Sequence, residues 1–258
     1  MNNRGAGIGA VRGTDELVVI PAFNEQDSVG GVVEQVRNAG YQALVIDDGS
    51  TDRTGEVAAA AGATVMRLPV NLGVGGALRC GFRYAVTHGY PVVVQCDGDG
   101  QHDPGEIAKL LEEMQRSGAD LVIGSRFRAP AANYEAGRGR RFVMRRLARM
   151  ASRRTGVTIT DATSGFRAIS GNLLGSFAAT YPAEYLGDTI ESLARAGRSG
   201  YKVAEVAVEM RARAAGVSTA STLASSWYLL RVVAAIWLQR FRPDDRRVRL
   251  TSWEGGPG

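Results

Sequence analysis

The segment VVVQCDGDGQHDP, residues 92–104, is an apolar run that ends in two carboxylates, Asp97 and Asp99, one residue apart. Two like charges this close repel each other unless a positive charge lies between them. Successive strand side chains alternate between faces, so both carboxylates point the same way if the extended geometry continues. Together with the amide oxygen of Gln101 they form an oxygen-only ligand set, which suits Mg²⁺ or Mn²⁺. An acidic loop that only solubilises a strand end is the alternative interpretation.

The elements that must position these residues alternate regularly along the chain. Short apolar runs alternate with amphipathic segments, which is typical of βαβ units and a mostly parallel sheet. We expect strands over 17–23, 42–48, 63–68, 92–97, 120–126 and 202–210. We expect helices over 28–38, 53–61, 74–88, 104–117, 186–197 and 223–241. The fold class predicted from this pattern is α/β.

Four of the expected strands end in polar groups: Asn24 and Glu25, Asp47 and Asp48, Asp97 and Asp99, and Arg126. In open α/β sheets, ligands bind along the carboxyl ends of the strands. The acidic pair is therefore part of a set of polar groups at one sheet edge. At that edge Asp48 could accept hydrogen bonds from a base or ribose.

Length and composition favour one large domain. The chain has 258 residues, is 45% hydrophobic and carries a net charge of +5, which is enough for one sizeable core. Only two cysteines are present, so a disulfide framework is not expected and a reducing compartment is. We predict a loose tail over 1–14, a catalytic domain over 15–221, and an amphipathic helix with a basic tail over 222–258.

Five motifs carry a resemblance to a known family. VVIPAFNE, VIDDGSTDRT, NLGVGGALRCGF, CDGDGQHDP and VIGSRF occur in the order and spacing of the family 2 glycosyltransferases. The branch most similar is that of the dolichyl- or polyprenyl-phosphate sugar synthases. DATSGFRAIS extends the likeness to about residue 170. The resemblance implies a single nucleotide-diphospho-sugar transferase domain of type A and an inverting reaction.

The resemblance also implies roles for individual residues. The nucleotide pocket, with contacts to base and ribose, would be lined by Pro21, Phe23, Glu25, Ile46 and Asp48. The family's Asp-x-Asp motif corresponds to Asp97, Gly98 and Asp99, and Gln101 matches a further metal ligand. The donor diphosphate would be contacted by Arg126 and Arg211, and Asp161 matches an acidic position near the reacting centre. Where the family often carries a late Lys, this chain has Ser218 and Thr219, so Thr219 is a weaker candidate for that phosphate contact.

The acceptor decides whether a general base is needed. A lipid monophosphate has a second pKa of roughly 6 and is largely anionic at neutral pH, so it requires none. A sugar hydroxyl of a cell-envelope polysaccharide or glycolipid would require a positioned carboxylate. The candidates are Asp161, Glu184 and Asp188. The last two are four residues apart, and they could instead be acids that complement the positive end of a helix dipole.

Two arginine-rich segments favour an acceptor carried by a membrane. Residues 138–154 hold eight arginines beside an apolar stripe, and apolar residues recur at helical spacing over 227–241 with arginines after them. Such faces suit an anionic leaflet and predict a peripheral protein on the inner, cytoplasmic face of the cell membrane. The alternative is a helix packed on the core or on a partner in a homo-oligomer. No nucleic-acid recognition motif accompanies the arginines, so nucleic acid is not an expected partner.

The sequence thus favours a metal-dependent hexosyltransferase that uses a nucleotide-diphosphate sugar and a polyprenyl phosphate. Transfer to a sugar hydroxyl is the second hypothesis. A degenerate sugar-nucleotide-binding protein without catalysis is the third, and the intact set of Asp97, Asp99, Gln101 and Arg126 argues against it.

Overall fold

The computed structural model describes residues 15–128, 146, 148–153, 155–182 and 187–211. The chain divides between Thr219 and Ala220 into two units, and every described residue belongs to the first. The tail over 1–14 and the helix over 222–258 lie outside the described residues. The predicted domain boundaries therefore stay a prediction.

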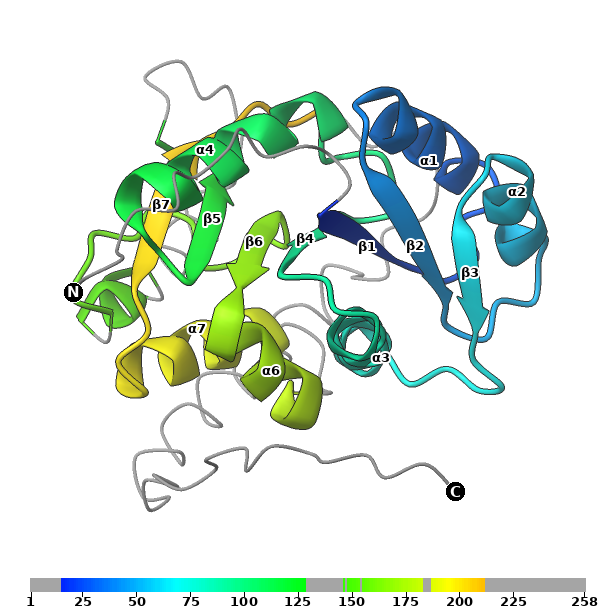
Figure 1. Cartoon of the computed structure of the whole chain (residues 1–258). Helices are drawn as coiled ribbons and strands as arrows, with labels where there is room; N and C mark the ends of the chain where they lie inside the picture. Colours follow the sequence, from blue (N-terminus) through cyan, green and yellow to red (C-terminus); the bar gives the residue numbers. More distant parts are fainter. Residues whose placement is uncertain (1–14, 129–145, 147, 154, 183–186, 212–258) are drawn as a thin grey trace, which may run out of the picture. The chain divides into compact units, whose positions relative to one another are not determined.

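The core element is a seven-stranded sheet in the order β3-β2-β1-β4-β6-β5-β7 (Figure 1). Its strands are β1 (Glu16–Ala22), β2 (Gln42–Asp47), β3 (Thr64–Arg67), β4 (Val92–Gln95), β5 (Leu121–Ser125), β6 (Arg167–Ser170) and β7 (Val203–Ala207). Strand β6 pairs antiparallel with both of its neighbours, and all other pairs are parallel. The predicted mostly parallel α/β sheet is confirmed.

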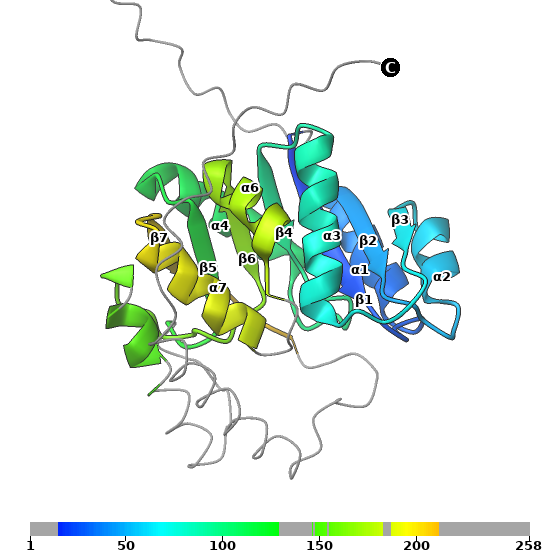
Figure 2. The same cartoon turned by 90° about the horizontal axis from the view of Figure 1, so that it is seen from below.

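Helices cover both faces of the sheet, as Figures 1 and 2 show. One face packs against α1 (Val29–Asn38), α2 (Thr54–Ala60) and α4 (Ile107–Ser117), and a 3₁₀ turn, η1 (Pro104–Glu106), leads into α4. The other face packs against α3 (Val74–Thr87), α6 (Gly171–Thr180) and α7 (Gly187–Arg198). Alternate side chains of the central strands enter the two cores, which is why these strands read as continuous apolar runs.

Two elements were missing from the sequence prediction. Strand β6 and helix α6 both lie within 167–180, between the expected strand over 120–126 and the expected helix over 186–197. Strand β6 is only four residues long and contains Arg167, which is 1% exposed. A short strand with a charged residue at a buried position carries no strong period-2 signal, so the prediction of this region was incomplete.

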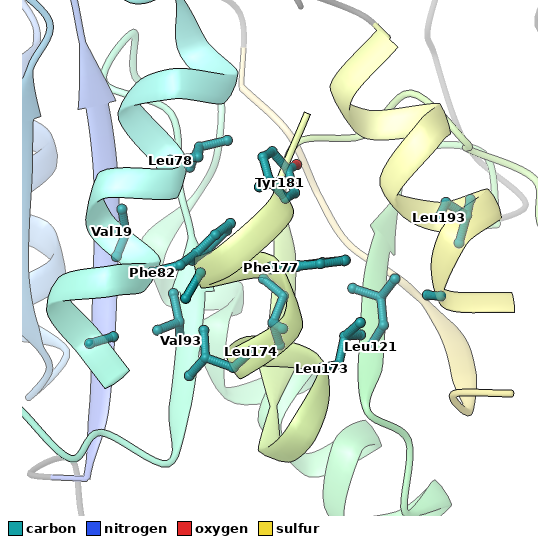
Figure 3. Close-up of a cluster of buried hydrophobic side chains, with 14 of the residues drawn as sticks. Val19, Leu78, Phe82, Val93, Leu121, Leu173, Leu174, Phe177, Tyr181 and Leu193 are labelled. Carbon is teal, nitrogen blue, oxygen red and sulfur yellow. The ribbon is translucent and has the colours of Figure 1, made fainter. Parts of the chain in front are cut away.

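An aromatic cluster joins α3 to α6 on the second face (Figure 3). The ring of Phe82 lies 6.0 Å from that of Phe177 and 5.1 Å from that of Tyr181, measured between centroids. All three side chains are at most 2% exposed. Val19, Leu78 and Val93 surround them, so the core ties α3 to β1 and to β4, the strand that the acidic pair follows.

Helix α3 approaches β1 closely at Gly81. A Cβ added there would lie 2.4 Å from Val19 Cγ1. We expect Gly81→Ala to lower the free energy of unfolding by roughly 1–3 kcal/mol, because overpacking forces the helix away from the sheet. Gly31→Ala in α1 is the matched control, since a Cβ there meets nothing within 4 Å. That change should stabilise the protein by about 0.5–1 kcal/mol. Denaturant unfolding of both variants checks the pair, and equal effects would contradict the close approach.

Glu16 is a buried carboxylate at the amino end of β1. It is 2% exposed, and its Oε2 has no hydrogen-bond partner among the described residues. Burial, and to a lesser extent the charge of Asp15, raises the pKa of Glu16 above its usual 4.5. The folded state then binds this proton more tightly than the unfolded state, so the group's contribution to stability falls as the pH rises past 4.5.

Glu16→Gln is therefore expected to raise the free energy of unfolding at pH 7 and to flatten its decline above pH 4.5. Urea unfolding from pH 4 to pH 8 measures both quantities. Glu34→Gln, at an exposed position of α1, is the control and should move stability by no more than about 0.5 kcal/mol. A Glu16→Gln protein less stable than the parent at pH 7 would contradict the prediction.

Candidate active site

The site lies where the strand order reverses. From β1 the chain winds outward through β2 and β3, and it then crosses back to place β4 on the other side of β1. Ligands of open α/β sheets bind at the carboxyl ends of the strands at such a switch point. The two strand ends are in close contact, because a Cβ on Gly98 would lie 3.3 Å from Ala22 Cβ and 3.4 Å from the Pro21 carbonyl oxygen. Pro21, which the resemblance places in the nucleotide pocket, therefore lies beside the 97–99 segment.

The acidic pair lies in one tight turn after β4. Gly100 has a φ of 77°, and the Gln101 N–H donates to Asp99 Oδ1 at 2.9 Å. The Asp97 side chain is 37% exposed, whereas Asp99 is 5% exposed. No group of three or more His, Cys, Asp or Glu side chains suited to a metal occurs among the described residues. Two carboxylates and one amide fit Mg²⁺ or Mn²⁺ only if a substrate supplies further oxygens, as a diphosphate does.

His102 fixes the backbone of this turn, a role that the sequence did not reveal. Its Nδ1 accepts the Asp97 N–H at 3.0 Å, and its Nε2 lies 3.7 Å from Asp97 Oδ2. The ring stacks on Phe166 with 5.0 Å between centroids and is 5% exposed. The only signal in the sequence was the place of this histidine directly after Gln101.

Gly165 brings a second segment against the acidic turn. A Cβ at this position would lie 3.2 and 3.3 Å from the two carboxylate oxygens of Asp97, and 3.3 Å from Gln95 Nε2. Gln95 is 2% exposed, and its Oε1 has no hydrogen-bond partner in the described part of the chain. The TSGF portion of DATSGFRAIS thus packs beside Asp97, and a glycine is needed because a side chain would press on the carboxylate.

Arg126 and Asp161 bind each other in this structure. Arg126 Nε and Nη2 donate to the two oxygens of Asp161 at 2.7 and 2.9 Å, and Nη2 also donates to Thr163 Oγ1 at 3.0 Å. The Asp161 side chain is 0% exposed and that of Arg126 is 18% exposed. Two parallel charge-assisted hydrogen bonds hold the guanidinium in one orientation. The resemblance implied that Arg126 faces the diphosphate and that Asp161 lies near the reacting centre. The structure adds that Asp161 orients Arg126.

Arg167, a buried residue of β6, holds the 161–165 segment through hydrogen bonds. Its guanidinium donates to the carbonyl oxygens of Ser164 at 2.7 Å and Ala162 at 3.2 Å. It also donates to the Thr189 carbonyl oxygen at 2.9 Å and to Ser192 Oγ at 3.0 Å, both in α7. The planar guanidinium carries several N–H donors in a fixed geometry, which suits four acceptors at fixed positions. This arginine, which sequence reasoning missed, ties α7 to the loop that touches Asp97.

On the nucleotide side, Asp48 lies at the end of β2. It is 3% exposed, and its Oδ1 accepts the Leu72 N–H at 2.7 Å. Burial raises the pKa of Asp48 above its usual value. Phe23, 40% exposed, follows β1 at the same edge. Ile46 differs from the expectation, because its side chain is 0% exposed in the core and so offers no surface to a base.

The motif residues around Glu25 stabilise one another. The Glu25 N–H donates to Thr54 Oγ1 at 2.8 Å, and Glu25 Oε2 accepts the Ser28 hydroxyl at 2.9 Å. Asn24 has a φ of 54°, and its Oδ1 accepts the Thr51 N–H at 2.9 Å. Hydrogen bonds therefore join the loop that contains FNE to the loop that contains DGSTDRT. Glu25 contributes to this framework, and the pocket-lining role that the resemblance implies for it stays a prediction.

Arg211, for which the resemblance implies a contact with the donor diphosphate, lies beside the acidic turn. Its Nη2 donates to Asp103 Oδ2 at 2.7 Å, its Nη1 donates to Gln35, and its backbone N–H donates to the Gln101 carbonyl oxygen at 2.9 Å. It therefore stabilises the acidic turn from the side of α1. Asp188 is the second residue of α7, so its candidate role as a general base stays a prediction. Glu184 and Thr219 lie outside the described residues.

The two arginine-rich segments are described only in part. Residues 146, 148–153 and 155 are helical, and Ala148 and Ala151 are buried while Met150 is 39% exposed. Ala151, predicted to lie on an apolar stripe, contacts the core. The predicted C-terminal helix over 223–241 lies outside the described residues. Within the described part of the chain, no helix is long and apolar enough to cross a bilayer.

The sheet topology and the acidic turn at its switch point define a type A glycosyltransferase domain. Residues 17–175 match the family described as Glycosyl transferase family 2, and the chain belongs to this family. This result confirms the resemblance derived from the motifs.

Three comparisons specify the likeness. The chain is 35% identical over 215 residues to polyprenol monophosphomannose synthase of Mycolicibacterium smegmatis, covering 80% of each protein. It is 32% identical over 214 residues to undecaprenyl-phosphate mannosyltransferase of Micrococcus luteus, covering 80% of this chain and 87% of that one. A solved structure of glucosyl-3-phosphoglycerate synthase from Mycobacterium tuberculosis with Mg²⁺ and uridine-diphosphate has a TM-score of 0.70. It is 25% identical and covers 95% of this chain and 87% of that one.

Proposed function

We propose that this glycosyltransferase moves a hexose from a nucleotide-diphosphate sugar to a polyprenyl phosphate, with inversion at the anomeric carbon. The observation that carries the proposal is the acidic turn of Asp97, Asp99 and Gln101 at the β1/β4 switch point. Its support is the similarity, over 80% of the chain, to relatives named for mannose transfer to polyprenyl carriers.

The turn would hold a divalent cation, Mg²⁺ or Mn²⁺, through Asp97, Asp99 and Gln101. Bound there, such an ion offsets negative charge that develops on the departing diphosphate. The chain's own contribution is to fix the donor. Asp48 and Phe23 would receive the nucleoside, and the oriented guanidinium of Arg126 would add donors near the diphosphate.

The acceptor phosphate would attack the anomeric carbon from the face opposite the diphosphate. A bond forms between this carbon and a phosphate oxygen, the bond to the diphosphate oxygen breaks, and the nucleoside diphosphate leaves. No proton need be removed, because the acceptor is already anionic at neutral pH. This step agrees with the state of Asp161, whose side chain is 0% exposed and hydrogen-bonded to Arg126 rather than placed to act as a base.

The test compares acceptors with and without a phosphate. The full-length protein is incubated with labelled GDP-mannose, UDP-glucose or UDP-N-acetylglucosamine and Mg²⁺ or Mn²⁺. A polyprenyl phosphate should yield a charged glycolipid, and the matched polyprenol should yield none. NMR of the product reports the anomeric configuration. Transfer to 3-phosphoglycerate or to a sugar hydroxyl, with none to the lipid phosphate, would refute the acceptor assignment.

The membrane location is part of the same proposal. We propose a peripheral association with the inner face of the cell membrane through residues 222–258 and the arginines of 138–154. Removal of 222–258 should release the protein from anionic vesicles and lower transfer to a long-chain acceptor, while a short soluble acceptor is still used. The interaction should weaken with salt, because surface attraction decays over about 8–10 Å at ordinary ionic strength. A truncated protein that still pellets with vesicles would contradict the anchor.

A further inference from the structure

Glu205 of β7 is a buried carboxylate with an unusual set of partners. It is 4% exposed and pairs in the sheet with Ile123 of β5. Its Oε1 accepts the N–H groups of Thr160 at 2.9 Å and Asp161 at 2.8 Å. Its Oε2 accepts the Thr160 hydroxyl at 3.0 Å, and Arg128 Nη1 lies 3.6 Å away.

Burial of a carboxylate in a strand costs free energy unless hydrogen bonds offset the loss of water. An apolar residue would fill the same position of β7 without that cost. The Glu205 carboxylate holds the backbone N–H groups of Thr160 and Asp161 in fixed positions, where the 160–165 segment passes β7. Thr160 is also held by Ser125, whose Oγ lies 2.7 Å from Thr160 Oγ1.

The contact continues directly to Arg126. The residue whose N–H is held by Glu205 is Asp161, and the Asp161 carboxylate orients the guanidinium through two hydrogen bonds. Glu205, Asp161 and Arg126 thus form one chain of charge-assisted hydrogen bonds from the sheet edge to the site. A shift of the Asp161 backbone would move the guanidinium with it.

We propose that Glu205 is a positioning residue of the transfer reaction: it sets the place of Asp161 and, through it, the orientation of the Arg126 guanidinium. The inference rests on the proposed function, because it assumes that Arg126 acts on the donor diphosphate. It assigns no contact between Glu205 and a substrate.

The test uses variants of graded severity in the full-length protein. Glu205→Asp keeps the charge but withdraws the carboxylate by one methylene, and Glu205→Ala removes it. Each should lower kcat about 10- to 100-fold, since misplacing a catalytic group by about 1 Å has effects of this size. The KM for the donor should change less, because the lost contacts serve charge that develops in the transition state. Glu205→Gln keeps an acceptor at Oε1 for both N–H groups, and it should retain more activity than Glu205→Asp.

Glu16→Gln and Glu16→Ala are the matched controls. Glu16 is equally buried, but it lies at the amino end of β1, the opposite end from the site. These changes should leave kcat within about 2-fold of the parent value, a margin that corresponds to less than about 0.5 kcal/mol. Circular dichroism and thermal unfolding of each variant establish that rates refer to folded protein. If Glu205→Ala does not fold, Glu205→Asp alone decides the outcome.

A double-mutant cycle separates positioning from a general structural role. In an Arg126→Lys background the two-point contact with Asp161 is absent, so Glu205→Asp should lower kcat by no more than about 2-fold further. A merely structural role predicts the same fold-loss in both backgrounds, and that result would overturn the inference. Wild-type kcat in Glu205→Asp would overturn it too. A parent protein without transfer activity would instead refute the proposed function, and binding of UDP or GDP with Mn²⁺ would show whether the nucleotide site itself exists.

Discussion

Asp99→Asn is expected to lower kcat by about 10³-fold or more while the protein stays folded. The amide keeps an oxygen that can accept the Gln101 N–H now donated to Asp99 Oδ1 at 2.9 Å, so the turn should persist. What is lost is one of two negative charges that would hold a divalent cation. A metal ion that stabilises a departing diphosphate contributes several kcal/mol, and each 1.4 kcal/mol is a tenfold change in rate.

Steady-state kinetics over a Mg²⁺ and Mn²⁺ series measures the loss, and calorimetry gives the affinity for UDP and GDP with and without Mn²⁺. The metal-dependent part of nucleotide affinity should disappear with the activity. Asp103→Asn is the control from the same loop, since Asp103 pairs with Arg211 and accepts the Gly105 N–H. Full activity of Asp99→Asn with either metal present would remove Asp99 from the site.

The second large effect is expected from Arg126→Ala. The change removes donors near the developing charge, and comparable losses in oxyanion sites lower rates about 10²- to 10³-fold. The change also removes the arginine partner of the Asp161 carboxylate, whose side chain is 0% exposed. Removal of one partner from a buried ion pair typically destabilises a protein by about 3–5 kcal/mol. Activity and stability should therefore fall together.

A paired deletion separates the two effects. Arg126→Ala combined with Asp161→Ala removes both charges and should recover much of the lost stability, because no unpaired carboxylate remains. Activity should not recover. Arg116→Ala is the control for a surface arginine, whose side chain is 75% exposed and pairs with Glu113 within α4. It should leave kcat unchanged and move stability by about 0.5 kcal/mol at most. Recovery of activity in the double variant would exclude Arg126 from the chemistry.

The acidic turn and the sheet edge could be predicted because local sequence determines both. Apolar runs such as 92–95 form strands wherever helices cover both faces, and polar residues directly after them must emerge at the carboxyl edge. The sequence placed Asp48, Asp97 and Asp99 after strands at one sheet edge, and the structure has them after β2 and β4, which lie on either side of β1. The place of a residue relative to the end of its own strand depends only on nearby residues, so it can be inferred from a single sequence.

Side-chain partners across the fold could not be predicted in the same way. Arg126 and Asp161 are 35 residues apart, Asp161 and Glu205 are 44 apart, and Arg211 and Asp103 are 108 apart. Which of several acids an arginine binds depends on the register of β5, β6 and β7, and the sequence analysis had missed β6 altogether.

By itself the sequence determined the α/β class, the family, and the presence of oxygen-bearing side chains at one sheet edge. Only the tertiary structure decided that Asp161 orients Arg126, that Gly165 packs beside Asp97, and that Glu205 and Arg167 hold the loop between them. The physical reason is that hydrophobic periodicity encodes which face of an element is buried, and it does so within a few residues. A buried charge carries no such pattern, because its partners are fixed only when distant strands take their register and the loops between them pack.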